Sequence, residues 1–263
     1  MTLAVHEWGT PGSPRVVCLH GVTAHGRHFA RLAERLAPHF HVLAPDLLGH
    51  GDSPWAPPWS NEAHLEAILT TLGREPATWI GHSYGARLAL ELAVREPACV
   101  ERMVFLEPAV FLPPEIALFA AENTCKERAY ASLAEGIDRR YEESALHGAP
   151  RQILEIELAT HLVRSADGIW RYRYSRPAVI AAYGEMAREP PPFRDARVPT
   201  LIVRGESSYL SYDHLLDAHC DALGDLLGVV TVDGGHTLLW DAFDETATAI
   251  ESFLPEVEFH VAE

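Results

Sequence analysis

The pentapeptide Gly81-His82-Ser83-Tyr84-Gly85 constrains the fold of this chain more than any other segment. It lies between a short apolar run, residues 77–80, and a helix-like run, residues 86–96. Glycines at both ends of the pentapeptide allow a tight turn and a close approach of strand and helix. Because a serine hydroxyl is a weak nucleophile, it needs such an exposed turn beside a base and backbone N–H groups. The pattern predicts a nucleophilic Ser83; the alternative is a serine that only caps the helix.

Short apolar runs alternate with helix-like stretches along the chain. These runs are residues 15–19, 40–44, 77–80, 103–106, 200–203 and 229–232. Continuous apolar runs are typical of strands that are buried on both faces of a parallel sheet. The alternation therefore predicts an α/β protein with a mostly parallel sheet and crossover helices.

The strand pattern stops between Pro108 and about Pro192, where the chain becomes helix-like. Proline pairs or triplets at residues 113–114 and 190–192 bracket this stretch, and they favour extended or turn conformations. We expect residues 109–192 to form a helical cap. The core is then expected to consist of residues 1–108 and 193–263.

Composition limits the class of partner. The 263 residues are 48% hydrophobic, which is enough for a sizeable core, and 21 basic against 37 acidic residues give a net charge of −16. A negative net charge disfavours binding to nucleic acid and to anionic membrane surfaces. No run approaches the ~18 apolar residues of a transmembrane helix, and no secretory leader pattern is visible at the start. We expect a cytoplasmic protein with free cysteines, of which Cys18 is a buried strand residue; the oligomeric state is not predicted.

His236 is the predicted base. It follows the last apolar run in the segment Val232-Asp233-Gly234-Gly235-His236, where the chain order nucleophile, acid, base requires it. His20, His25 and His28 lie closer together, but no carboxylate or cysteine completes a metal-ligand motif around them. We therefore expect neither a metal ion nor an organic cofactor.

Two backbone N–H groups are needed to stabilise the oxyanion of acyl transfer. One is expected from Tyr84, directly after the nucleophile and at the positive end of the helix. The second is expected from Val22, in the loop that follows the run 15–19. The alternative for this loop is an ordinary turn at Gly21.

Five segments in this order resemble the α/β-hydrolase superfamily, over essentially residues 1–255. They are His20-Gly21, the stretch from Asp46 to Ser53, the turn around Ser83, Asp167-Gly168-Ile169-Trp170, and Gly234-Gly235-His236. The resemblance implies an eight-stranded, mostly parallel sheet with helices on both faces, a helical cap, a serine nucleophile and a histidine base.

The chain departs from the family pattern at the acid that orients the histidine. In the family this residue usually stands shortly after the strand at 200–203, but Ser208 occupies that place here. Three carboxylates compete for the role: Glu107, Glu206 and Asp213. Glu107 closes the run 103–106 at a carboxyl strand end, where haloalkane dehalogenases and certain small esterases carry their acid. We expect Glu107 to be the acid that orients His236. Asp213 is the alternative, and Glu206 is expected to face solvent.

The expected activity is hydrolysis of a small-molecule ester or lactone through an acyl-enzyme. Carbon–carbon bond hydrolysis of a dicarbonyl compound on the same triad is one alternative. A ligand-binding or receptor-like protein with vestigial turnover is another, which the serine at 208 favours. The aromatic residues of the cap could line an apolar pocket, or they could pack the cap onto the sheet. Arg171, Arg173 and Arg176 could bind an anionic group of the substrate, or they could form a solvated helix face.

Overall fold

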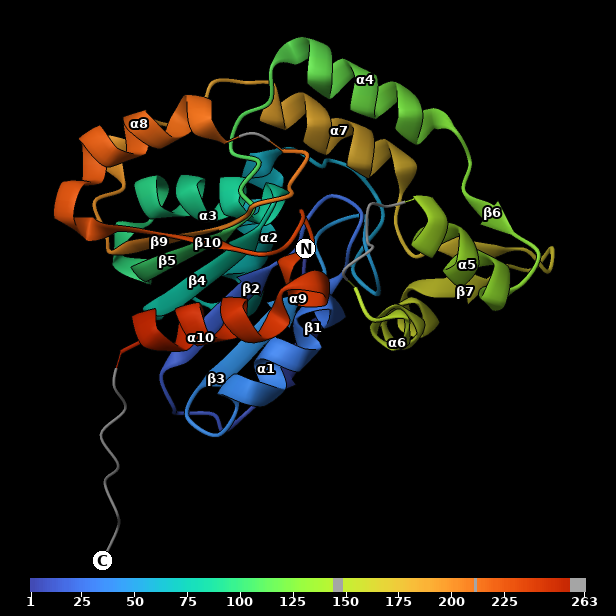
Figure 1. Ribbon diagram of the computed structural model, residues 1–263, viewed down its shortest axis with the longest axis horizontal. Coiled ribbons are helices and arrows are strands. Elements are labelled where there is room, and N and C mark those ends of the chain that lie inside the picture. Colours follow the sequence, from blue (N-terminus) through green and yellow to red (C-terminus); the bar gives the residue numbers. More distant parts are fainter. Residues whose placement is uncertain (144–148, 211, 256–263) are drawn as a thin grey trace, which may run out of the picture.

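A seven-stranded sheet organises the protein (Figure 1). The computed structural model describes residues 1–143, 149–210 and 212–255. The strand order is β1-β3-β2-β4-β5-β9-β10, and every neighbouring pair is parallel except β1 with β3. The strands are β1 Val5–Trp8, β2 Arg15–Leu19, β3 His41–Pro45, β4 Ala77–His82, β5 Val100–Leu106, β9 Thr200–Gly205 and β10 Leu227–Val232. The predicted mostly parallel sheet is confirmed, with seven strands in the described residues where eight were expected.

Each of the six apolar runs forms a strand, but the sequence did not predict β1. This strand, Val5-His6-Glu7-Trp8, lies at the edge of the sheet, and β3 is its only partner among the strands that the structure describes. Its side chains are half-buried or exposed, so it lacks the continuous apolar run that marks the inner strands. An edge position thus explains why the hydrophobic pattern missed it.

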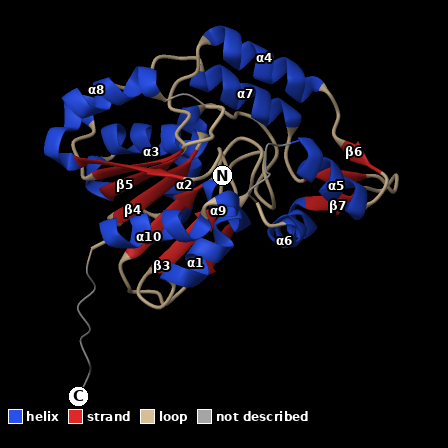
Figure 2. Ribbon diagram, viewed as in Figure 1, coloured by secondary structure: helices blue, strands red, loops and turns tan. Residues whose placement is uncertain are grey.

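Helices cover both faces of the sheet (Figure 2). Val17 and Leu19 of β2 pack into one buried apolar cluster with α2, α3 and α8, whereas Val16 and Cys18 pack into a second cluster with α1 and α10. Alternate strand residues point to opposite faces, so a fully apolar strand feeds both clusters. The helices are α1 Ala30–Leu36, α2 Asn61–Leu72, α3 Tyr84–Arg95, α8 Asp213–Leu223, α9 Leu238–Asp241 and α10 Phe243–Phe253. The four cysteines are free, and Cys18 is buried as predicted.

The described residues between β5 and β9 form four α-helices, a short 3-10 helix at Phe193–Asp195 and a small separate sheet. The α-helices and strands are α4 Pro114–Cys125, β6 Ala129–Tyr130, α5 Leu133–Glu143, α6 Arg151–His161, β7 Leu162–Arg164, β8 Trp170–Tyr172 and α7 Arg176–Met186. Helices make up most of this segment, as expected, but it also contains three antiparallel strands of two or three residues, which are too short to give a readable sequence pattern. In Figure 1, α4 and α7 lie together, and α5 and α6 lie beside the small sheet. None of the described helices is long and apolar enough to cross a lipid bilayer.

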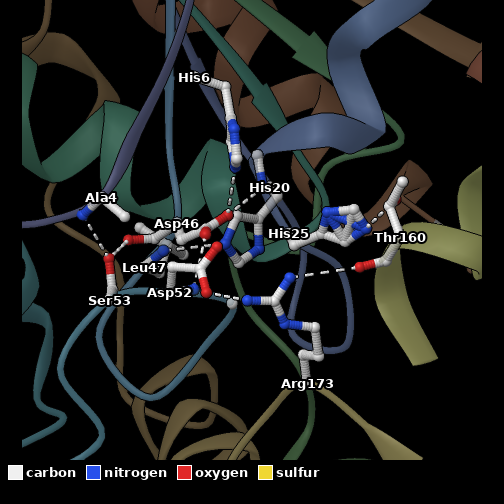
Figure 3. Close-up of polar contacts among 12 residues, drawn as sticks. Ala4, His6, His20, His25, Asp46, Leu47, Asp52, Ser53, Thr160 and Arg173 are labelled. Atoms are coloured by element: carbon white, nitrogen blue, oxygen red, sulfur yellow. Dashed lines mark hydrogen bonds and ion pairs between the residues drawn. The ribbon is translucent and has the colours of Figure 1, made fainter. Parts of the chain in front are cut away.

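The buried carboxylate of Asp46 joins the loops that follow β2 and β3 (Figure 3). Its Oδ1 accepts a hydrogen bond from the Gly26 amide at 2.7 Å and lies 3.2 Å from His6 Nε2. Its Oδ2 accepts from the Asp52 amide at 2.9 Å. Burial raises the pKa of Asp46, but the hydrogen bonds from His6 and Gly26 outweigh it and lower the pKa to about 2. The charged carboxylate is therefore the form that the fold stabilises.

We predict that Asp46→Asn lowers the free energy of unfolding by about 2 kcal/mol at pH 7, because an amide cannot accept all three contacts. The pKa of Asp46 in the folded state lies below the ordinary value of 3.8. The charged carboxylate therefore contributes fully to the free energy of unfolding above pH 3.8, and this contribution is lost as the pH falls towards 2. Urea unfolding of both proteins at pH 7 and pH 3 measures this. An equal difference at the two pH values would contradict an electrostatic origin.

Candidate active site

Ser83 occupies a strained turn between β4 and α3. Its backbone angles, φ 54° and ψ −116°, lie in a region that residues other than glycine rarely adopt. A Cβ at Gly81 would lie 2.4 Å from the Ala86 nitrogen, and one at Gly85 would lie 2.0 Å from the Leu19 carbonyl oxygen. Both glycines are therefore required by the close approach of strand and helix. In the described part of the chain the Ser83 hydroxyl makes no capping bond to α3, which removes the helix-cap alternative.

Glu107 leaves the sheet beside Ser83. The last residues of β4 and β5, His82 and Leu106, are paired in register, so the next residue of each chain segment emerges at the same edge. Glu107 also has a positive φ, 47°, and only 3% of its surface is exposed. Two adjacent strand ends thus carry a strained backbone together with the side chains of the candidate nucleophile and the candidate acid.

The carboxylate of Glu107 contacts His236. Its Oε2 lies 3.3 Å from His236 Nδ1 and also accepts a hydrogen bond from the Ser208 hydroxyl. Its Oε1 accepts from the Gly205 amide at 2.6 Å. Buried carboxylates are tolerated when they are hydrogen-bonded in this way. A carboxylate oxygen accepts hydrogen bonds, so His236 Nδ1 is the donor in this contact and Nε2 is the ring nitrogen that Glu107 does not engage.

The other two candidate acids lie elsewhere. Asp213 is the first residue of α8, and its largely exposed carboxylate pairs with Arg204 at 2.7 Å. Glu206 is exposed to solvent, as predicted. Ser208, which stands where the family's acid is expected, instead donates its hydroxyl to Glu107. No sequence pattern marked this contact.

The loop carrying His236 packs directly onto β9. A Cβ at Gly205 would lie 2.3 Å from the Gly234 carbonyl oxygen and 2.5 Å from that of Gly235. His82 Nε2 donates to the His236 carbonyl oxygen at 2.9 Å, and the Gly235 amide donates to Asp241 at 3.0 Å. These contacts hold the imidazole loop over the carboxyl end of the sheet.

The loop after β2 lies beside Ser83. A Cβ at Gly21 would lie 3.2 Å from the Ser83 Cβ. His20 fixes this loop, because its Nδ1 donates to the Gly21 carbonyl at 2.8 Å and its Nε2 accepts from the Leu47 amide at 2.9 Å (Figure 3). Burial lowers the pKa of His20 well below its usual range, so the ring is neutral. Val22 lines the cavity next to Ser83, and its carbonyl contacts His50 Nε2 at 2.8 Å.

Tyr84 follows Ser83 as the first residue of α3. Its amide is one of the N–H groups at the helix start that lack an intrahelical acceptor, where the helix dipole is positive. The ring is fully buried, and its hydroxyl donates to Asn61 Oδ1 at 2.6 Å. The side chain thus anchors the turn while the backbone remains beside Ser83.

His20, His25 and His28 point to different partners. The His25 ring packs against His161, and His28 Nδ1 contacts Glu157. Within the described residues, no group of three or more histidine, cysteine or acidic side chains is arranged to hold a metal ion.

A cavity of about 450 Å³ opens above Ser83 and His236. Its apolar wall comes mainly from the first and last parts of the segment between β5 and β9: Leu112, Ile116, Ala120, Tyr183 and Met186. Of the aromatic residues considered from the sequence, Tyr172, Tyr174 and Tyr183 line it, whereas Phe119 is exposed.

The arginine cluster considered from the sequence makes its contacts outside this cavity. Arg171 pairs with Glu127 and Asp167, and Arg173 pairs with Asp52 (Figure 3). The arginines that do line the cavity are Arg128 and Arg140. No sequence pattern marked these two arginines, because Arg128 lies in the connection before β6 and Arg140 lies on α5.

Comparison with known proteins identifies the scaffold. A model of the alpha/beta hydrolase family matches residues 16–249. The chain belongs to the α/β-hydrolase family. It is 36% identical to lipase LipV of Mycobacterium tuberculosis, over 96% of this chain and 97% of that protein. It is also 30% identical to the 3-hydroxybutyrate-oligomer hydrolase of Cupriavidus necator, over 79% of this chain and 78% of that protein. Among solved structures, E-2-(acetamidomethylene)succinate hydrolase has a TM-score of 0.84 at 25% identity and covers 95% of this chain and 94% of its own.

We predict that Gly205→Ala destabilises this α/β-hydrolase by about 1 to 3 kcal/mol, because the added methyl group meets backbone oxygens that cannot yield easily. The matched control is Gly184→Ala in α7, where a Cβ meets no described atom within 4 Å. This control should be about 0.5 to 1 kcal/mol more stable than wild type. Urea unfolding measures both, and a Gly205→Ala protein as stable as wild type would contradict the close packing of the His236 loop.

Proposed function

We propose that the protein is a serine hydrolase that cleaves a carboxylic ester or lactone through an acyl-enzyme. The observation that carries the proposal is the contact between His236 Nδ1 and Glu107 Oε2 at 3.3 Å, with Ser83 and His236 lining one cavity. A carboxylate, an imidazole and a hydroxyl in this relation are the parts of a nucleophilic triad. The named activities of lipase LipV and the 3-hydroxybutyrate-oligomer hydrolase agree with ester cleavage.

In the proposed reaction, Ser83 Oγ attacks the acyl carbon while His236 Nε2 takes its proton. Glu107 holds the imidazole in the required tautomer and stabilises the imidazolium. The amides of Val22 and Tyr84 stabilise the oxyanion. His236 then returns the proton to the leaving alcohol, and water cleaves the acyl-enzyme by the same steps in reverse order. A lactone would give a single hydroxy acid by this route.

Two other functions can be compared with this proposal. A receptor-like protein was suggested by the missing aspartate at position 208, but Glu107 makes the contact with His236 that such an aspartate would make. Carbon–carbon bond hydrolysis would use the same triad, and no described contact favours it over ester cleavage. Turnover of a 1,3-dicarbonyl compound in place of every ester tested would replace the proposal with this alternative.

A fluorophosphonate probe tests the nucleophile. We expect stoichiometric labelling of the wild-type protein at Ser83 and none of Ser83→Ala, because the probe reacts with activated serines. Intact-mass spectrometry gives the stoichiometry, and peptide mapping gives the site. Folded wild-type protein that stays unlabelled would overturn the serine-hydrolase proposal.

A pair of matched acid-to-amide variants tests the triad acid. Glu107→Gln should lower kcat for a 4-nitrophenyl ester about a thousandfold or more, because the amide neither fixes the tautomer nor offsets the imidazolium charge. Asp213→Asn should stay within about twofold of wild type, since its carboxylate pairs with Arg204 on the surface. Circular dichroism controls for folding. Loss of activity in Asp213→Asn alone would show that Glu107 is the wrong acid.

A further inference from the structure

A buried arginine connects the start of the segment between β5 and β9 with the end of α7. Arg87 lies one turn into α3, and only 2% of its surface is exposed. Its Nη1 donates to the Val110 carbonyl oxygen at 2.7 Å, shortly after β5, and to the Arg188 carbonyl oxygen at 2.9 Å, shortly after α7. Its Nη2 donates to the Glu189 carbonyl oxygen at 3.1 Å. One side chain of α3 therefore holds two stretches of main chain that are far apart in the sequence.

The buried carboxylate of Glu91 keeps this guanidinium in place. Arg87 Nε donates to Glu91 Oε1 at 2.8 Å, one helical turn further along α3. The same oxygen accepts from Asn61 Nδ2 at 2.5 Å, and Oε2 lies 3.3 Å from Arg95 Nη2. Buried charges are tolerated when they are paired and hydrogen-bonded in this way. The planar guanidinium donates to Glu91 and to three carbonyl oxygens at once, which the compact ammonium of a lysine cannot reproduce.

Two residues of the cavity wall lie next to the carbonyl groups that Arg87 holds. Leu112 follows Val110 by two residues, Met186 precedes Arg188 by two, and both line the cavity. The Leu112 amide also donates to the Met186 carbonyl oxygen at 2.8 Å. Arg87 is not among the described residues that line the cavity. It therefore supports Leu112 and Met186, the wall pair, from outside the cavity.

The turn at Ser83 has supports of its own. The Ser83 carbonyl oxygen accepts from the Ala109 amide at 3.1 Å, and the Tyr84 hydroxyl donates to Asn61. Neither contact involves Arg87. Replacing Arg87 should therefore disturb the wall pair more than the turn that carries the serine.

We propose that Arg87 is a positioning residue that holds the wall pair and thereby favours substrates with an apolar chain long enough to reach it. The inference rests on the proposed ester hydrolysis and adds a residue that determines its chain-length specificity. Arg87 acts only through the main chain, because it touches neither the cavity nor the reacting atoms in the described structure.

A double variant removes the contacts of Arg87 without leaving a buried charge unpaired. In Arg87→Met/Glu91→Gln the methionine cannot donate to the carbonyl groups, while the glutamine can still accept from Asn61. Arg95→Met is the control, since Arg95 lies on the same helix and contacts the same acid, and its printed contacts are to Glu91 and Glu62 alone. Circular dichroism checks that each protein is folded. If the double variant does not fold, Arg87→Lys carries the test, with smaller effects expected in the same direction.

Hydrogen–deuterium exchange measures the position of the wall pair without any substrate. We expect peptides that cover residues 109–113 and 185–190 to exchange at least about tenfold faster in the double variant, because local opening no longer breaks the bonds to Arg87. Peptides of β4 and of the turn at Ser83 should exchange as in wild type, and Arg95→Met should show no change in any of these peptides. Unchanged exchange at 109–113 and 185–190 in a folded variant would overturn the proposal.

Ester pairs of different chain length measure the specificity. The first pair is 4-nitrophenyl acetate and hexanoate, and the second is ethyl and hexyl acetate, which place the longer chain on the acyl side and on the alcohol side. We expect wild type to prefer the longer ester of one pair, and the double variant to lower this ratio of kcat/KM about tenfold, mainly through a higher KM. A mere loss of folded protein would instead lower kcat for every ester and leave the ratio unchanged. Equal kcat/KM within both pairs for wild type, or a ratio that the folded double variant retains, would overturn the proposal.

Binding separates this inference from the proposed activity. Calorimetric titration of Ser83→Ala, with and without the double substitution, measures the preference for the longer ester without turnover. Wild type that hydrolyses no ester, together with a binding preference that the double substitution removes, would refute the activity and support the role of Arg87. Ester hydrolysis with unchanged exchange and an unchanged ratio would support the activity and refute that role. Faster exchange with an unchanged ratio would show that Arg87 holds the wall pair but does not determine specificity, which also contradicts the proposal.

Discussion

The buried carboxylate of Glu107 is the interaction on which the arrangement of this site depends. It receives hydrogen bonds from the Gly205 amide and the Ser208 hydroxyl, and it contacts the imidazole of His236. One side chain thus connects the end of β5 with the end of β9 and with the loops that follow β9 and β10. Taking a charge out of water is costly, and only this full set of partners makes its position stable.

A second buried carboxylate holds the opposite side of the site. Asp46 follows β3 and joins the loops after β2 and β3, while Glu107 follows β5. In the sheet, β2 and β4 lie between β3 and β5, so the two carboxylates flank the strand end that carries Ser83. Hydrogen bonds to a buried carboxyl group therefore hold both sides of the turn at Ser83, and they position the loop of Val22 and the loop of His236. This rigidity is what preorganised stabilisation of an oxyanion requires.

Several features of the fold were predictable because they depend on neighbouring residues. The inner strands form continuous apolar runs because they are buried on both faces, and β2 fills both core clusters with alternate residues. The turn at Ser83 was predictable because the close approach of strand and helix leaves no room for a side chain at Gly81 or Gly85. By contrast, the edge strand β1 and the three short strands β6, β7 and β8 leave too weak a pattern to be read.

The sequence by itself determined the strand-to-helix turn that carries Ser83, the parallel sheet beneath it and the position of His236 after the last strand, because each of these follows from patterns within a few residues. Only the tertiary structure decided which carboxylate meets His236. Glu107, Glu206 and Asp213 are chemically equivalent acceptors in the sequence, and the choice between them depends on strand register and on the packing of Gly205 against the Gly234 loop. The histidines of the cavity wall are a second example, because His28, His82 and His161 come from three separate segments and line one cavity only after folding.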